Sequence, residues 1–387
     1  MREFIDGGTA IARAALDAGC TFFAGYPISP ATPLLLHMVR ELPKMGGIAV
    51  QAEDEIAAIS MCIGAVMTGA RALTATSGPG ISLCSENIGL AIMGEVPLVI
   101  VDAQRMGPAT GGATTVSQGD VQFVRWGTSG GFPIIALAPS SVAECYSLTL
   151  RAFDLAERFR VPVFLMTDKE MFLSMSTVEL GSYERPPVRA RSGTPAPNAG
   201  EPFFPWRFDP IDRPPPFSPY GGEHIMRFTG SSHDERGMLT KDATRVGRLN
   251  EHLRQKIEDH LDEIEFVRAD IQAGASTLVI SYGITARAMV EAVRIARAAG
   301  HRVSSLTIQS LWPVPEAAIL RALRDEAGEM AAERVVVAEL NLGDFCREVE
   351  RVIYTWAARN RRVAPSVDSL HRFDGEMITP AQFLEAL

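Results

Sequence analysis

The first 175 residues alternate between short, continuously apolar runs and longer stretches in which apolar positions recur every three or four residues. Residues 96–101 read VPLVIV, which is typical of a strand buried on both faces of a parallel sheet. Strands separated by helices indicate βαβ units, so we predict an α/β fold with a doubly wound sheet. The expected strands are 21–24, 48–51, 70–76, 96–101, 132–136 and 162–167. The expected helices are 10–18, 32–41, a helix that ends at residue 69, and 141–159. Ser140 or Ser141 is expected to cap the last of these helices.

A second α/β pattern begins near residue 275. Its expected strands are 277–282, 303–308 and 334–340. The expected helices are 286–299, capped by Thr285, one opened by Pro313 and Pro315 within 311–320, and 345–358.

The segment between the two patterns is rich in proline, because eleven of the 25 prolines lie between residues 186 and 219. Proline at this density excludes regular helix and central strand, while the interleaved aromatic residues favour an extended arm that lies across a surface, such as that of a neighbouring subunit. Residues 245–272 are expected to form a charged connector helix. We therefore predict domains at 1–178 and 274–387, with the arm and connector at 179–273.

Charge and cysteine usage narrow the class of protein. The net charge of −9 argues against a nucleic-acid partner, and no run of about 18 apolar residues predicts a membrane span. The N-terminus also lacks the apolar core of a signal peptide. The five cysteines are far apart in apolar surroundings, which favours buried free thiols in a reducing cytoplasm and makes an iron–sulfur cluster held by this chain alone unexpected.

The stretch from 51 to 80 carries the first candidate chemistry. Glu53, Asp54 and Glu55 open a helix that is rich in small residues and packs closely against something else. Burying a carboxylate is costly unless a group pairs with it, so a ligand or another chain is the expected partner. The alternative is that all three acids lie in an exposed first turn, where they favour the helix dipole.

Three loops follow predicted strands, where doubly wound sheets bind ligands. GYPISPATP (25–33) is stiffened by three prolines, and TSGPG (76–80) exposes backbone N–H groups at a helix start. In VDAQRMGPATGG (101–112), Arg105 is placed to grip a carboxylate bidentately. The competing interpretations are a rigid turn for the first loop and a structural ion pair for Arg105. Neither unit contains a phosphate-binding GxGxxG or GxxxxGK[ST] motif.

These loops, together with TSGPGISLCSENIGLA, SQGDV, the HIMRFTGSSHDERG stretch (224–237), LWPVPE and AELNLGDF, resemble the α subunit of 2-oxoacid:ferredoxin oxidoreductases over nearly the whole chain. For His224 and His233, a turn, lid or interface role competes with a metal site. The resemblance implies a doubly wound domain of the type that binds the pyrimidine half of thiamine diphosphate, followed by a transketolase C-terminal-like domain.

The resemblance also implies site residues. Glu55 matches the acid that exchanges a proton with N1′ of the cofactor, and Arg105 matches the carboxylate-binding arginine. The cofactor is expected to contact Pro27, Thr76, Ser77 and Gly78 as well as Glu55. Substrate and coenzyme A are expected near Tyr26, Ile28, Ser29 and Pro30, and Ser29 stands where family members usually carry threonine.

No site for the cofactor's diphosphate is expected here, because Gly343-Asp344-Phe345 lacks the last glycine of GDG. The resemblance therefore implies a β subunit that supplies the diphosphate site, Mg²⁺ and a [4Fe–4S] cluster, in an (αβ)2 complex with or without separate γ and δ subunits. The implied reaction converts a 2-oxo acid and coenzyme A to acyl-CoA and CO2 and reduces ferredoxin.

Several alternatives stay open at this point. 2-Oxoglutarate is favoured as substrate over pyruvate, branched-chain and aryl 2-oxo acids, because the separate chain with this GPATG form looks most like that subgroup. A thiamine enzyme without electron transfer and a non-catalytic scaffold subunit are the competing functions.

Overall fold

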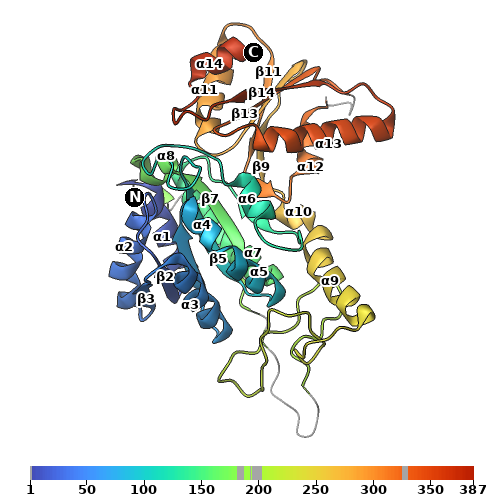
Figure 1. The fold of residues 1–387 in the computed structure, drawn as a ribbon. Coiled ribbons are helices and arrows are strands. Elements are labelled where there is room, and N and C mark those ends of the chain that lie inside the picture. The colour runs from blue at the N-terminus through green and yellow to red at the C-terminus, as the bar shows by residue number, and fades with distance from the viewer. Residues whose placement is uncertain (1, 181–186, 192, 194–202, 325–329) are drawn as a thin grey trace.

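The computed structural model describes residues 2–180, 187–191, 193, 203–324 and 330–387. Figure 1 shows two α/β units one above the other, with the arm below the first unit and helix α9 (Ala243–Glu258) beside it. None of the described helices is both long and apolar enough to cross a membrane.

The first unit is built on a seven-stranded sheet with the order β12-β6-β7-β5-β4-β2-β3. Every pairing is parallel except that of the edge strand β12 with β6. The strands are β2 (Phe22–Gly25), β3 (Ile48–Gln51), β4 (Ala72–Thr76), β5 (Leu98–Gln104), β6 (Ile135–Leu137), β7 (Val163–Asp168) and β12 (Ser310–Trp312). The predicted α/β class and doubly wound parallel sheet are thereby confirmed.

Helices cover both faces of this sheet because its central strands are apolar on both sides. All seven residues of β5 are buried, and Val99 and Val101 face one core while Leu98 and Ile100 face the other. The first core is closed by α1 (Gly7–Asp17), α2 (Thr32–Glu41) and α7 (Val142–Phe159), and the second by α3 (Glu55–Met67), α4 (Pro79–Leu83), α5 (Ser85–Met93) and α6 (Val121–Trp126). Short elements beside them are 3₁₀ helix η1 (Leu42–Met45), α8 (Lys169–Leu173) and the antiparallel pair β1 (Glu3–Ile5) and β8 (Ser176–Val178).

The second unit has a five-stranded sheet with the order β14-β13-β10-β11-β9, in which only β9 is antiparallel. Its strands are β9 (Val267–Asp270), β10 (Thr277–Ser281), β11 (Val303–Ile308), β13 (Arg334–Glu339) and β14 (Ser366–His371), and its helices are α11 (Thr285–Ala298), α12 (Glu316–Ala322), α13 (Asp344–Asn360) and α14 (Pro380–Ala386). Strand β12 leaves this unit to extend the first sheet, and Trp312 Nε1 donates to the Val121 carbonyl at 3.0 Å. One apolar core runs through both units.

Most predicted elements are confirmed to within a few residues, including Ser141 as the cap of α7. The connector helix expected at 245–272 is wrong in its second half. α9 ends at Glu258, a short helix α10 (Leu261–Ile264) follows, and β9 pairs with the distant β11. Thr285 is the first residue of α11 rather than its cap, because its hydroxyl donates to Gln118 Oε1 at 3.3 Å. In 311–320, the helix begins only at Glu316, after strand β12.

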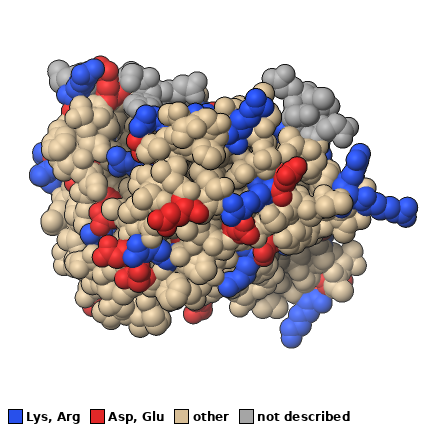
Figure 2. Space-filling view, turned by 90° about the horizontal axis from the view of Figure 1, so that it is seen from above, with Lys and Arg blue, Asp and Glu red and all other residues tan. Residues whose placement is uncertain are grey.

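Residues 203–242 of the arm pack on the first unit of the same chain and contain no helix or extended strand. Tyr220 N donates to the Met67 carbonyl at 2.8 Å, at the end of α3, and Phe217 joins the core that both units share. Acidic and basic side chains are interspersed on the face drawn in Figure 2.

Candidate active site at the carboxyl edge of the first sheet

The three acids that open α3 have different surroundings. Glu53 is exposed, and Asp54 caps the helix by accepting a hydrogen bond from Ala57 N at 2.7 Å. Glu55 is only 6% exposed, so it does not lie in an exposed first turn. Within the described residues, no group donates a hydrogen bond to its carboxylate, which leaves both oxygens available to a ligand.

The loop after β4 approaches the Glu55 carboxylate closely enough to require glycine at position 80. A Cβ atom on Gly80 would lie 2.5 Å from Glu55 Oε1 and still closer to Thr76 Oγ1. The hydroxyls of Thr76 and Ser77 are buried and have no partner within the described chain. The site therefore combines a buried carboxylate, two hydroxyls without a partner and a glycine backbone. These groups suit the binding of a polar heterocycle.

Arg105 follows β5 directly and is 6% exposed. Its Nη1 donates to the Ser29 carbonyl at 2.6 Å, while its Nε is buried without a partner. No Asp or Glu oxygen of the described residues lies within 4.0 Å of the guanidinium, so Arg105 is not held in a structural ion pair. Because a Cβ on Gly78 would lie 3.6 Å from Arg105 Cγ, this side chain connects the 25–33 loop with the 76–80 loop.

The remaining candidates of the 25–33 loop lie at the surface of the isolated chain, with one exception. Tyr26, Pro27 and Ser29 are exposed, Ile28 is half-buried against the apolar core, and Pro30 is buried. The structure thus brings Ser29 to Arg105 through its backbone, whereas Tyr26 and Pro27 make no polar contact with Glu55.

Sequence reasoning missed an acid pair beside this site. Asp102 lies opposite Thr76 in the β4–β5 register, and its side chain lies within hydrogen-bonding reach of that of Asp120. Burial and the charge of Asp120 raise the pKa of Asp102 well above its usual value, and burial raises the pKa of Asp120 to about 6. The only sequence signal was that both residues belong to quoted motifs, VDAQR and SQGDV.

The SQGDV segment also fastens the second unit to the site. Gln118 N donates to the Leu340 carbonyl at 2.8 Å, and Gln118 Oε1 accepts from Leu340 N at 3.0 Å. Asn341 Nδ2 donates to the Gln118 carbonyl at 2.8 Å. The second unit therefore fixes the segment that carries Asp120.

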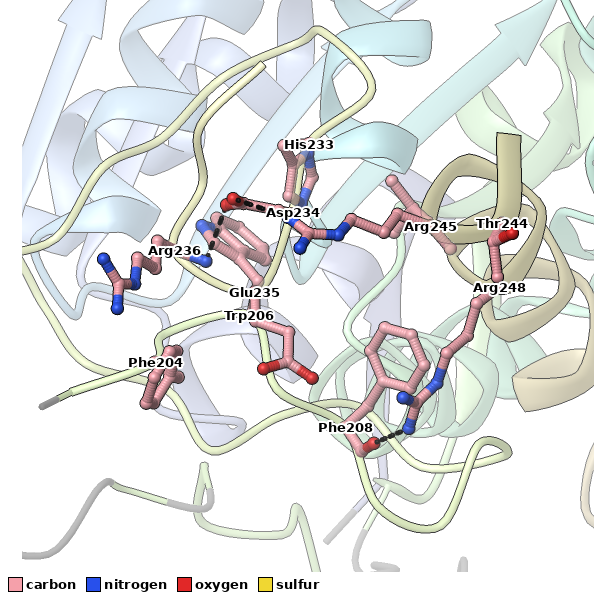
Figure 3. A pocket seen from close by; sticks show the side chains of 11 residues that line it. Phe204, Trp206, Phe208, His233, Asp234, Glu235, Arg236, Thr244, Arg245 and Arg248 are labelled. Atoms are coloured by element: carbon pink, nitrogen blue, oxygen red, sulfur yellow. Dashed lines mark hydrogen bonds and ion pairs between the residues drawn. The ribbon is translucent and has the colours of Figure 1, made fainter. Parts of the chain in front are cut away.

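A hollow of about 550 Å³ lies between the arm and α9, and its lining includes residues 233–236 of the HIMRFTGSSHDERG stretch (Figure 3). In this hollow, Asp234 Oδ2 lies 3.5 Å from Arg245 Nη1, and Arg248 Nη2 donates to the Phe208 carbonyl. His233 packs edge-on against Trp206, and His224 stacks on Phe203. No group of three or more His, Cys, Asp or Glu side chains in the described chain is arranged to hold a metal ion.

Comparisons with known proteins agree with this architecture. Residues 13–249 match the family model "Pyruvate flavodoxin/ferredoxin oxidoreductase, thiamine diP-bdg", and residues 275–383 match "Pyruvate:ferredoxin oxidoreductase core domain II". The 2-oxoglutarate synthase subunit KorA of Methanothermobacter thermautotrophicus is 41% identical over 99% of this chain and 97% of its own length. That of Methanocaldococcus jannaschii is 38% identical over 100% of this chain and 99% of its own length.

Two solved structures are also similar to this chain in fold. A 2-oxoglutarate:ferredoxin oxidoreductase from Magnetococcus marinus, with 2-oxoglutarate, coenzyme A and succinyl-CoA bound, superposes on all of this chain with a TM-score of 0.85 and 27% identity. The match spans 64% of that longer chain. A split-gene transketolase matches 98% of this chain and 94% of its own length with a TM-score of 0.54 and 12% identity, which shows a shared fold alone. The chain belongs to the 2-oxoacid:ferredoxin oxidoreductase family, in which it is an α-type subunit.

Proposed function

We propose that this subunit, joined to a partner subunit, oxidatively decarboxylates a 2-oxo acid with coenzyme A, and that the 2-oxo acid is 2-oxoglutarate. The observation that carries the proposal is the buried Glu55 carboxylate, which faces bare backbone at Gly80 and has no protein partner in the described chain. The names of the KorA relatives and of the Magnetococcus structure support 2-oxoglutarate. A ketoisovalerate oxidoreductase subunit at 33% identity, over 90% of this chain and 92% of its own length, keeps branched-chain substrates as the alternative.

The residues around Glu55 fit the pyrimidine half of thiamine diphosphate. The hydroxyls of Thr76 and Ser77, which have no partner in the described chain, offer hydrogen-bond partners beside the Glu55 carboxylate. When bound, thiamine diphosphate supplies the carbon nucleophile and the electron sink that decarboxylation needs. Pro27 is the further residue that we place near it.

Glu55 holds the proton that is exchanged with the ring nitrogen N1′. A carboxylate that is buried and free of internal hydrogen bonds is suited to this role, because a bound ring nitrogen is then its principal partner. Arg105 binds the substrate carboxylate through its unpaired N–H groups, and its bond to the Ser29 carbonyl fixes the direction of the guanidinium. Tyr26, Ile28, Ser29 and Pro30 border the path of substrate and coenzyme A.

The diphosphate half of the cofactor belongs to the partner subunit in this proposal. Gly343 and Asp344 lie in the second unit, where they begin α13, and Asp344 pairs with Arg347. We therefore place Mg²⁺, the diphosphate site and the [4Fe–4S] cluster in a β subunit, within an (αβ)2 complex that reduces ferredoxin and has room for separate γ and δ subunits. The domain division 1–178, 179–273 and 274–387 is part of the same proposal. The five buried free thiols support a reducing, cytoplasmic location.

The test is reconstitution with a β-type subunit from the same organism. The complex is expected to reduce a one-electron acceptor with coenzyme A and 2-oxoglutarate, and more slowly with pyruvate or ketoisovalerate. Glu55→Gln keeps the size of the side chain and removes the transferable proton, so turnover should fall by at least about 100-fold. Unchanged turnover in that variant would refute the role of Glu55.

A further inference from the structure

The segment that follows Arg105 forms a small hairpin, residues 106–115, which is closed by its own backbone. Met106 N donates to the Thr115 carbonyl at 3.0 Å, and Gly112 N donates to the Met106 carbonyl at 2.9 Å. The tip of the hairpin, residues 107–111, is exposed. Because Met106 is joined to Arg105 by one planar peptide bond, a displacement of the hairpin also displaces the backbone from which the Arg105 side chain extends.

The second unit holds the C-terminal end of this hairpin. Val116, the next residue, is buried in an apolar core that is otherwise formed by the second unit and includes Ile378. Ser117 Oγ donates to the Leu340 carbonyl at 3.0 Å, next to the bonds between Gln118 and Leu340. The hairpin is thereby fastened to the second unit, although Arg105 belongs to the first.

Gly375 brings the second unit into contact with the hairpin itself. A Cβ atom on Gly375 would overlap Thr115 Cγ2 and would lie 3.4 Å from Met106 Sδ, so only a residue without a Cβ fits against them. The φ angle of Gly375 is +85°, which also favours glycine. Gly375 therefore packs against Met106 and Thr115, the two ends of the hairpin.

We propose that Gly375 is a positioning residue for Arg105, through which the second unit sets where the guanidinium meets the carboxylate of a 2-oxo acid. The inference rests on the proposed role of Arg105. A guanidinium binds a carboxylate bidentately only in a fixed geometry, so a shift of the hairpin by about 1 Å should cost one of the two hydrogen bonds. Glu55 extends from α3 and not from the hairpin, so the chemical step should change less than substrate binding.

Gly375→Ala tests this coupling in the assembled complex, because the hairpin must move to relieve the overlap with Thr115. Calorimetry measures the dissociation constant of N-oxalylglycine, a non-reactive analogue of 2-oxoglutarate, and steady-state kinetics give KM for the 2-oxo acid that the complex turns over. Both constants should rise about tenfold, which is the effect of losing one charged hydrogen bond, while kcat changes less than about threefold.

Two further variants separate positioning from a loss of stability. Thr115→Ala in the Gly375→Ala background removes Cγ2, and the closest remaining atoms are Met106 Sδ at 3.4 Å and Thr115 Cβ at 3.6 Å, which are ordinary contacts. Both constants should therefore return to within about threefold of those of the parent complex. Gly300→Ala, just beyond α11, imposes similar backbone strain at a φ of +92° with no atom within 4 Å of the new Cβ. It should lower the melting temperature without changing either constant.

Asp374→Ala tests the same turn without adding an atom that could block folding. Asp374 shapes the turn by accepting hydrogen bonds from Arg372 Nη2 at 2.7 Å and from Glu376 N at 3.2 Å. Its loss should raise both constants about two- to fivefold. Asp368→Ala, which breaks a similar exposed ion pair with Arg334, should leave both constants unchanged.

Three outcomes decide the inference. Unchanged binding of N-oxalylglycine by a folded Gly375→Ala complex, or a double variant that binds no better than Gly375→Ala, overturns the inference alone. If Gly375→Ala does not assemble, unchanged constants in Asp374→Ala overturn it in the same way. A parent complex that turns over no 2-oxo acid overturns the proposed function and the inference together.

Discussion

Gly80→Ala tests the geometry of the candidate site by adding one methyl group. The new Cβ would lie 2.5 Å from Glu55 Oε1, whereas ordinary contacts of a Cβ begin near 3.4 Å. Relief therefore requires a movement of about 1 Å. Thr76 can rotate its hydroxyl away, but the backbone of Glu55 is fixed by the Asp54 cap, so the carboxylate itself must swing aside.

The size of the effect follows from this movement. Overpacking of this kind costs about 1–3 kcal/mol of stability, which leaves a domain of this size folded. A misplacement of about 1 Å at a reacting group costs about 100-fold in rate, so kcat should fall by roughly that factor. The control is Gly247→Ala in α9, where a Cβ meets no atom within 4 Å, and replacing a mid-helix glycine should stabilise the chain by about 0.5–1 kcal/mol without a change in rate.

The assay is 2-oxoglutarate-dependent reduction of a one-electron acceptor by the reconstituted complex, alongside the melting temperature of each variant. If Gly80→Ala melts within a few degrees of the parent chain and yet retains its kcat, then the Glu55 carboxylate does not act where the structure places it, and the site assignment fails.

Three further predictions follow from two buried contacts and one exposed glycine. Lys256→Met leaves Glu95 without its ammonium partner at 3.0 Å and should cost about 3–5 kcal/mol of unfolding free energy in urea. Although burial opposes it, the charges of Lys256 and His252 hold the pKa of Glu95 far below its usual range, so this loss should be full above about pH 5 and shrink as the pH falls further. Gln118→Ala should cost about 2–4 kcal/mol and speed hydrogen exchange at Leu340 N, which loses its acceptor. Gly64→Ala has open space around its Cβ, so it should leave the melting point of the isolated chain unchanged or higher, while sedimentation should show weaker assembly if α3 packs on the partner.

The sequence predicted the elements whose formation depends on local pattern. Continuous apolar runs identified the parallel strands, because a strand covered on both faces has no polar alternation to obscure it. β9 was missed for the opposite reason. Its residues VRAD are largely exposed, and it is a strand only because it pairs with β11, more than 30 residues away. A pairing partner at that distance leaves no trace in local periodicity.

The candidate site was predictable only in part. The burial of Glu55 and the absence of an ion pair at Arg105 could not be read from the sequence, since both depend on loops from three strands meeting at one edge. The Asp102–Asp120 contact escaped prediction because each acid alone resembles an ordinary residue after a strand or before a helix. Their proximity depends on Gln118 and Leu340, which hold the intervening segment against the second unit.

Buried polar atoms without a partner are unevenly distributed in the described chain. Folded proteins satisfy nearly all buried polar groups, so unpaired ones should be few and scattered unless they serve a purpose. In the described chain, six of the eleven buried side-chain atoms without a partner belong to Thr76, Ser77, Asp102, Arg105 and Asp120. Thr76 and Ser77 end or follow β4, Asp102 lies in the last half of β5 and Arg105 follows it, and Asp120 lies in the segment that the second unit fastens beside them. The free energy cost of leaving these atoms unpaired is therefore concentrated at one edge of one sheet. This is the arrangement expected of half an active site, whose ligand and remaining residues come from outside the chain.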